Sequence, residues 1–368
     1  MNRYLIITAI YRFVCGGLIL LINWELANPK STIALAVSIV LSFVPAIFTP
    51  FIVNSLLKKL SGSLLSKYSF LAIVFLVIIT AFVYANSKLL ILCNFILWTI
   101  FFLLETSFEL WFSELVESQS EDFINKYSSL SMTVNQVALM VGPLFITFIV
   151  KYINLKKIFI LYGLLYLLLF FCTKGLKSLQ VELEKTDIEV EQIKLSHYFI
   201  SMLMWPILGT INFMLPIYTT YQKGGMYEVA FLDSALGIGM ALVGVILSKY
   251  LSQTYNRVFM YISFILPFVW FMFEDSFFIR LILMLLFGIS FGGARIIFRK
   301  IVVMRYSSGS IKKIYSLGNA LGLSILALSI YIGTLNISTV WLPSFLLLII
   351  LLILLNIQYK KGSNLSGK

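Results

Sequence analysis

The sequence is built from apolar stretches that are each long enough to cross a lipid bilayer. Residues 70–84, 158–172 and 342–355 contain no acidic, basic or histidine side chain. About twenty apolar residues in a helix span the hydrocarbon core of a membrane. Because lipid offers no hydrogen bonds, the backbone polar groups of such a segment have to be satisfied within a helix. The pattern therefore predicts an all-α integral membrane protein.

The number of these stretches predicts about twelve transmembrane helices, with both chain termini on the same side. The expected spans lie near residues 4–23, 32–53, 68–85, 88–111, 128–150, 156–173, 196–219, 227–249, 257–273, 277–298, 314–334 and 339–357. Of the 368 residues 60% are hydrophobic and 12% are charged, and the mean hydropathy is +0.97. A water-soluble globule needs more charge on its surface, so that class is excluded.

The distribution of Lys and Arg predicts which side the termini occupy. One set of loops, together with the termini, holds Arg3, Lys58, Lys59, Lys67, Lys174, Lys177, Lys185, Lys194, Lys249, Arg257, Arg299, Lys300, Arg305, Lys312, Lys313, Lys360, Lys361 and Lys368. The opposite set holds Lys30, Lys88, Lys151, Lys156, Lys157, Lys223 and Arg280. Because basic residues accumulate on the cytoplasmic side, we expect both termini there, in the plasma membrane. The same rule accounts for the net charge of +12, so nucleic acid is not an expected partner.

A polar segment in the middle of the chain divides the spans into six and six. Residues 174–195 mix acidic, basic and apolar side chains, which favours a surface helix on the cytoplasmic side. We therefore expect an N-terminal bundle of residues 1–173, a linker of residues 174–195 and a C-terminal bundle of residues 196–368. Residues 105–116 can be laid over residues 291–302, with Glu109 opposite Arg295, as in transporters with duplicated halves.

Six plus six helices, a polar central loop and a basic loop between the second and third helices resemble the major facilitator superfamily, over essentially the whole chain. Gly142–Pro143 in the fifth span resembles the Gly-Pro pair of the superfamily's antiporter motif, where Gly permits close helix contact and Pro bends the helix. Pro50, followed by Lys58 and Lys59, resembles the start of the family's loop between helices two and three. The detail most resembles the bacterial efflux branch, its macrolide-exporter-like and siderophore-exporter-like members.

The chain departs from the family pattern at several positions, and the glycines that flank the antiporter motif are missing around Phe145–Phe148. Val53 and Leu57 stand where the family's loop has Gly and Asp, and Phe101 stands near the place of an arginine that is common in the fourth helix. The resemblance implies two six-helix, pseudo-symmetric bundles that rock about a site near the middle of the membrane.

Glu105 and Glu109 lie in the fourth span, four residues apart and therefore on one face of the helix. A charged side chain at the bilayer centre costs about 2.5–3.5 kcal/mol, so such residues are functional candidates. Two neighbouring carboxylates repel each other when both are charged, so we expect one of them to carry a proton near neutral pH. For Glu109 the alternative is a solvated or arginine-paired residue near the cytoplasmic end of the helix.

Arg12 in the first span needs an anionic partner, because a guanidinium group does not lose its proton. In the geometry that the resemblance implies, helices one and four both line the central cavity, so Arg12 can reach Glu105. A structural ion pair and an anionic substrate are equal alternatives for Arg12. Tyr11, next to Arg12, and Trp98 in the fourth span are further candidates for the substrate cavity.

Several other polar residues fall within the spans. Asp233, early in the eighth span, is either a third proton-coupling candidate or a cap at the membrane interface. We expect Arg295 to extend to the inner membrane surface. The uncharged residues at several depths hydrogen-bond helices to one another or contact the substrate; they are Asn135, Gln136, Asn212 and Asn319.

The sequence lacks the motifs of other function classes. No HExxH motif and no phosphate-binding glycine loop occurs, so we expect neither an enzyme nor a nucleotide site, and no cofactor. Cys15, Cys93 and Cys172 lie in apolar spans without motif spacing, which indicates neither a disulfide framework nor a metal site. We expect His197, the only histidine, to be a surface residue at the cytoplasmic interface rather than a proton relay.

The function that we expect is proton-coupled efflux of a small amphipathic compound by alternating access. Glu105 would exchange a proton for the substrate, and some of the aromatic residues, 15% of the chain, would line an apolar cavity. The alternatives are an importer of a small metabolite on the same fold and a non-transporting membrane protein of the immunity or receptor-like kind. The expected partners are the substrate, the proton and the lipid bilayer, and we expect the chain to act as a monomer.

Overall fold

The structure, a computed structural model, describes residues 1–27, 32–48, 52, 61–116, 121–173, 193–249, 253–306 and 308–363. Within these ranges the regular structure is helical. The helices are α1 (Asn2–Leu26), α2 (Thr32–Phe43), α4 (Gly62–Val83), α5 (Ser87–Val116), α6 (Glu121–Ile149), α7 (Leu155–Cys172), α8 (Leu195–Tyr221), α9 (Met226–Lys249), α10 (Gln253–Met272), α11 (Phe277–Arg305), α12 (Ser308–Leu335), the short 3-10 helix η1 (Ile337–Thr339) and α13 (Leu342–Ser363).

Each predicted span overlaps one of these helices, which confirms the all-α membrane fold. The second span is only partly covered, because α2 ends at Phe43 and residues 49–51 and 53 lie outside the described residues. Among the described residues, eight helices are long and apolar enough to cross a bilayer. Shorter apolar stretches lie at residues 33–48, 134–149, 256–272 and 320–335. Several helices extend beyond the predicted spans, and α6 begins at Glu121 rather than near residue 128. The helical backbone can continue outside the hydrocarbon, because polar side chains there remain in contact with water.

Local sequence explains where the third span separates from the fourth and where the ninth separates from the tenth, although the loops between them are short. The side-chain oxygen of Asn86 accepts hydrogen bonds from the backbone N–H groups of Lys88 and Leu89, at 3.1 and 3.3 Å, and so caps the start of α5. Ser276 precedes α11, and its side chain accepts from Ile279 N. These caps satisfy donors that the first turn of a helix leaves free, so a helix can start directly after a short loop.

The chain divides into two compact units. The first consists of residues Met1–Leu26 and Leu41–Lys185, and the second of Ala27–Val40 and Thr186–Lys368. Residues 174–192, which carry most of the predicted linker and its surface helix, lie outside the described residues, as do Pro50, Val53, Leu57, Lys58 and Lys59. The predicted bundle boundaries at residues 173 and 196 stay predictions.

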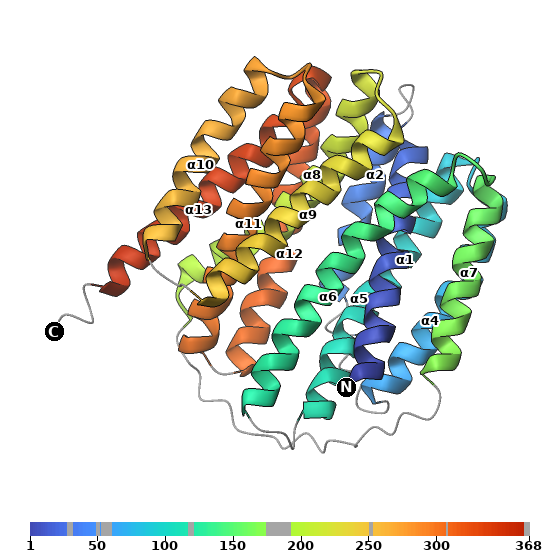
Figure 1. Ribbon diagram of the computed structural model, residues 1–368, viewed down its shortest axis with the longest axis horizontal. Coiled ribbons are helices and arrows are strands. Elements are labelled where there is room, and N and C mark those ends of the chain that lie inside the picture. Colours follow the sequence, from blue (N-terminus) through green and yellow to red (C-terminus); the bar gives the residue numbers. More distant parts are fainter. Residues whose placement is uncertain are drawn as a thin grey trace. The chain divides into compact units, whose positions relative to one another are not determined.

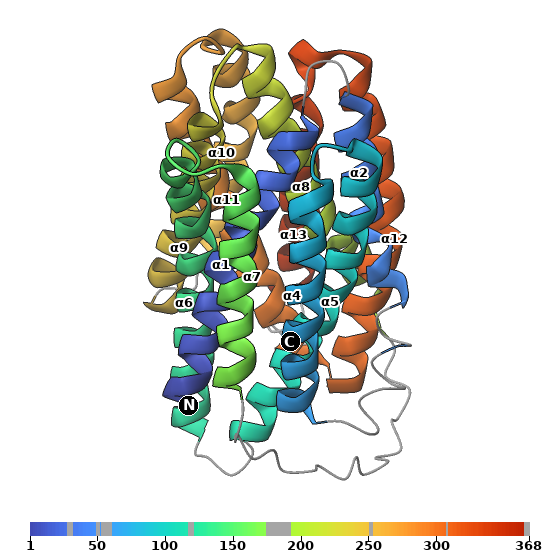
Figure 2. The ribbon, with the colours of Figure 1, turned by 90° about the vertical axis from the view of Figure 1, so that its right-hand side faces the viewer.

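The two units pack equivalent helices in the same order. In the first unit α1 packs against α6 and α7, and α4 packs against α5 and α7 (Figure 2). In the second unit α8 packs against α12 and α13, and α10 packs against α11 and α13 (Figure 1). The first helix of each half therefore meets the fifth and sixth, and the third meets the fourth and sixth. This is the pseudo-symmetric arrangement expected of duplicated halves.

Glycines set the closest helix contacts in both units. A Cβ atom added at Gly142 in α6 would collide with the carbonyl oxygen of Phe13 in α1, and one added at Gly322 in α12 would collide with that of Met202 in α8. Small residues allow membrane helices to approach at backbone distance, where van der Waals packing is strongest. The bend that Pro143 would introduce into α6 stays a prediction.

Candidate functional site

One face of α5 carries the main candidate residues. Leu89, Leu92 and Ile96 are exposed apolar residues that lie on one side of this helix. Glu105 follows Ile96 after nine positions, which is about half a turn around the helix axis. Glu105 is therefore on the side opposite to this exposed apolar row, which is where a polar pathway through the protein would run.

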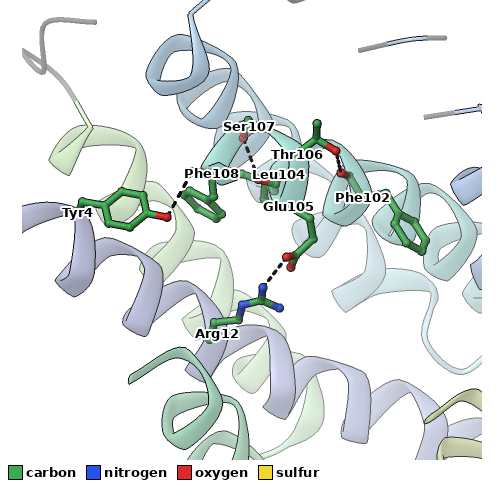
Figure 3. Close-up of polar contacts among 8 residues, drawn as sticks. All are labelled: Tyr4, Arg12, Phe102, Leu104, Glu105, Thr106, Ser107 and Phe108. Carbon is green, nitrogen blue, oxygen red and sulfur yellow. Dashed lines mark hydrogen bonds and ion pairs between the residues drawn. The ribbon is translucent and has the colours of Figure 1, made fainter. Parts of the chain in front are cut away.

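Arg12 and Glu105 form an ion pair within the first unit. Arg12 Nη2 donates to Glu105 Oε2, and the two side chains point toward one another from α1 and α5 (Figure 3). The Arg12 side chain is 24% exposed and the Glu105 side chain 33%. Pairing offsets the cost of about 2.5–3.5 kcal/mol that each unpaired charge would carry within the membrane. Both charged side chains are only partly buried.

A second contact holds α1 and α5 in register near this pair. The hydroxyl group of Tyr4 donates to the backbone carbonyl oxygen of Phe108 at 3.2 Å (Figure 3). The Tyr4 ring is 4% exposed and packs edge-on against Trp111, with ring centres 5.1 Å apart. Tyr4 lies two turns from Arg12 on α1, so this contact positions the guanidinium group opposite Glu105.

An aromatic cluster around Trp98 lies on the same face of α5 as Glu105, nearer the start of the helix. The indole ring of Trp98 stacks on Phe43, with ring centres 5.6 Å apart and an interplanar angle of 29°. Phe101 and Phe102 pack against the same ring at 6.0 and 5.9 Å. Trp98 precedes Glu105 by seven positions, or about 10 Å along the helix axis. Trp98 is half-buried and lies on the same face of α5 as Glu105.

Tyr11 lies in the core rather than on the accessible face. Its ring is fully buried, with ring centres 6.1, 6.1 and 5.2 Å from those of Phe70, Phe101 and Phe108. The Arg12 guanidinium carbon lies 5.5 Å from the Tyr11 ring centre. Tyr11 therefore supports Arg12 from within the bundle, and its predicted place in the substrate cavity stays a prediction.

The other candidates of the first unit lie on α5 and α6. Glu109 is exposed, one turn beyond Glu105. In α6, Asn135 and Gln136 are half-buried, and Asn135 Oδ1 is buried without a hydrogen-bond partner among the described residues. The structure thus brings Arg12 and Glu105 together, while the roles of Glu109, Asn135 and Gln136 remain predictions.

In the second unit, Asp233 lies well inside α9. The helix begins at Met226, seven positions earlier, so the alternative that Asp233 caps a helix at the interface is wrong. Phe231 and Leu242 are exposed, and Asp233 is about half a turn from both around the helix axis. Asp233 is half-buried, and its proton-coupling role stays a prediction.

The other predicted residues of the second unit lie on α8, α11 and α12. Asn212 is half-buried in α8. Asn319 falls in α12, but its side chain lies outside the described residues. Arg295 is exposed, with its guanidinium carbon 5.8 Å from the ring centre of Phe291, and its extension to the membrane surface stays a prediction. In the described part of the chain, no group of three His, Cys, Asp or Glu residues could hold a metal ion.

Sequence reasoning missed a buried charge cluster at one end of the second unit. Arg280 in α11 is 4% exposed and lies 3.5 Å from Glu228 in α9. The hydroxyl group of Tyr218 in α8 donates to Glu274 at 3.4 Å, and the Arg280 guanidinium carbon lies 5.6 Å from the Tyr218 ring centre. Arg280 was assigned to a loop, although it falls inside the predicted span 277–298. The position of Arg280, the fourth residue of an apolar run, could have indicated that it is a buried charge.

The prediction for His197 is wrong, because this residue is buried. Its side chain is 0% exposed, and Nδ1 lies 2.9 Å from the hydroxyl oxygen of Tyr306, beyond the end of α11. That hydroxyl oxygen also accepts from the backbone N–H of Lys194 at 3.1 Å. Tyr306 follows the part of α11 that extends beyond the predicted span, and it contacts the start of α8, which a prediction based on membrane depth does not include.

Comparison with known proteins finds a fold and no sequence relative. No protein-family model matches the chain, and no curated protein matches its sequence. A variant of the nucleoside transporter NupG superposes with a TM-score of 0.73 at 13% identity over 98% of both chains. The human organic anion transporter MFSD10 (TETRAN) gives 0.66 at 13% identity over 96% of this chain and 99% of that one. At this identity the likeness shows the major-facilitator-like fold alone.

Proposed function

We propose that this protein is a proton-coupled secondary transporter that moves a small amphipathic compound across the plasma membrane by alternating access. The fold is one in which two six-helix halves surround a site near the middle of the membrane. Solved transporters share this fold over nearly the whole chain. The sequence offers no nucleotide-binding motif, so an ion gradient is the energy source that fits it.

The observation that carries the proposal is the partly exposed ion pair between Arg12 and Glu105. Charged residues within membrane spans are costly, and they mark substrate pathways and proton relays. Glu105 can take up a proton, whereas Arg12 remains charged. Protonation of Glu105 therefore breaks the pair and changes what the face of α5 can bind. Trp98 supplies an aromatic surface for the apolar part of the substrate.

Two directions of transport follow from different observations. Export is favoured by Gly142–Pro143, the pair that resembles the antiporter motif of the superfamily, and Gly142 lies at the closest contact between α6 and α1. Import together with a proton is favoured by the ion pair itself. Arg12 neutralises Glu105 when no substrate is bound, and an empty carrier without net charge at its site can return across the membrane at low electrostatic cost.

The test of the proposed function is flux in proteoliposomes with an imposed proton gradient. We expect the wild-type protein to move at least one compound of a panel of dyes, nucleosides, antibiotics and aromatic acids against its concentration gradient. The sign of the gradient that drives accumulation gives the direction. Glu105→Gln should abolish the dependence on the proton gradient, while Glu25→Gln, near the other end of α1, should retain it. Unchanged proton dependence in Glu105→Gln would exclude Glu105 as the carrier.

A further inference from the structure

We propose that the substrate is an amphipathic organic anion whose charged group replaces Glu105 on Arg12 when Glu105 takes up a proton. This inference rests on the proposed transport function and adds to it the chemical class of the substrate. It also makes the proton and the substrate travel together. The argument uses the charges of the site, the groups around them and the position of the aromatic cluster.

The charge balance of the pair selects an anion. With Glu105 ionised, Arg12 and Glu105 together carry no net charge. A proton on Glu105 leaves the site with one positive charge, because Arg12 does not titrate. A cation bound to ionised Glu105 leaves the same excess. Only a proton together with an anion returns the site to neutrality, and a net charge in a membrane span is unfavourable.

The groups around Glu105 do not supply that anion themselves. The titratable residues near it are Tyr4, Tyr11 and Cys15 on α1 and Glu109 on α5. Tyr4, Tyr11 and Cys15 are neutral groups in the buried core. Glu109 is exposed, one turn beyond Glu105, and its charge acts on Tyr4. On α4, which packs against α5, the ammonium group of Lys67 lies 5.1 Å from the ring centre of Phe170, on α7.

The aromatic cluster defines the rest of the ligand. Trp98 is held from one side by Phe43, and its half-buried ring lies on the same face of α5 as Glu105. The separation of about 10 Å along the helix suits a molecule with an aromatic group at one end and a carboxylate at the other. We therefore use 4-phenylbutyrate as the probe, with the neutral 4-phenylbutyramide and the cationic 4-phenylbutylamine as matched controls.

The experiment measures ligand binding and proton uptake by the full-length protein in detergent. At pH 6.5 we expect 4-phenylbutyrate to bind the wild-type protein with uptake of about one proton per ligand, recorded with a pH indicator in weak buffer. The amide and the amine should cause no uptake. Binding without proton uptake, no binding at 10 mM, or stronger binding of the amine would each overturn the proposal.

A variant separates the anion site from the proton site. Glu105→Gln resembles the protonated residue, so at pH 7.5 it should bind 4-phenylbutyrate at least tenfold more tightly than the wild type does, without proton uptake. The double variant with Arg12→Gln should lose this gain. Equal affinity in Glu105→Gln and the wild type would contradict the exchange. If Glu105→Gln does not fold, the wild-type proton uptake decides the question.

The outcomes also separate this inference from the proposed function. Proton-linked binding of 4-phenylbutyrate without flux of any compound in proteoliposomes would support the anion site and count against transport. Proton-driven flux of neutral or cationic compounds, with no binding of 4-phenylbutyrate, would support transport and overturn the anion site.

Discussion

At the scale of single residues, buried polar contacts fix how α4 meets α5. The side chain of Glu114 is 7% exposed, and its Oε1 accepts a hydrogen bond from the backbone N–H of Gly62 at 3.0 Å. Gly62 is the first residue of α4, where N–H groups lack partners within the helix and the helix dipole is positive. A carboxylate from α5 therefore caps α4 across the helix interface.

Removal of this carboxylate should destabilise the protein. We expect Glu114→Ala to cost about 1–3 kcal/mol, because it leaves a buried backbone donor without a partner. Thermal unfolding in detergent measures the loss. Glu109→Ala is the matched control, since Glu109 is an exposed glutamate on the same helix, and we expect a change within about 0.5 kcal/mol. Equal losses in both variants would show that the cap contributes nothing specific.

A pair of serines one turn further along the same interface allows a cleaner measurement. The hydroxyl oxygens of Ser66 and Ser107 lie 2.7 Å apart, and both residues are fully buried. Interhelical hydrogen bonds in membranes contribute about 0.6 kcal/mol on average. A double-mutant cycle of Ser66→Ala and Ser107→Ala should give a coupling energy of about that size. Strictly additive effects would mean that each hydroxyl is satisfied by its own helix backbone.

The sequence predicted some residue contacts and missed others for a physical reason. Arg12 and Glu105 could be paired in advance because intramembrane charges need partners and because the resemblance to the major facilitator superfamily implied that helices one and four line one cavity. The contacts of His197 with Tyr306 and of Arg280 with Glu228 depend on how far α11 extends and where it crosses α8 and α9. Hydropathy gives the position of a residue along the membrane normal but not the residues beside it.

At the scale of elements, glycines bring α9 and α11 together at backbone distance. A Cβ atom added at Gly288 in α11 would collide with the carbonyl oxygen of Leu236 in α9. A Cβ atom added at Gly239 in α9 would collide with that of Leu285 in α11. The two glycines therefore face each other's helix at one crossing. The sequence analysis did not identify this crossing, because the position on one helix that meets a glycine of the other depends on how the two helices cross.

Opposite effects are expected for two Gly→Ala variants of this helix pair. Gly288→Ala should destabilise the protein, because the methyl group meets a backbone carbonyl that cannot move without separating α9 from α11. At Gly244 the nearest atom to an added Cβ is Ile296 Cδ1 at 3.9 Å. Since Ala favours a helix over Gly by about 0.5–1 kcal/mol, Gly244→Ala should be neutral or stabilising. Thermal unfolding of both variants tests the crossing, and a loss at Gly244 equal to that at Gly288 would contradict it.

At the scale of the whole molecule, most of the fold could be predicted from hydropathy. Apolar segments of about twenty residues form transmembrane helices, because lipid cannot satisfy the backbone polar groups of other structures. The order in which the helices pack then follows from two equivalent halves. The helix ends were less predictable. Polar residues such as those at the start of α6 and the end of α11 extend each helix into the interface, where lipid no longer sets the limit.

Orientation in the membrane is the prediction that follows from charge over the whole chain. With both termini cytoplasmic, the loop between α8 and α9 lies outside and the segment between α11 and α12 lies inside. Alkaline phosphatase fused after Gly225 should be active, and green fluorescent protein fused at the same place should not fluoresce. Fusions after Tyr306 and at Lys368 should give the reverse result.

Three basic residues, Lys151, Lys156 and Lys157, oppose this orientation. The ammonium group of Lys156 lies 4.2 Å from the ring centre of Phe82, so part of this charge is held at the end of α4 and α7. Active phosphatase after Tyr306 would reverse the assignment and would place Glu109, near the end of α5 that leads toward α6, on the outer side.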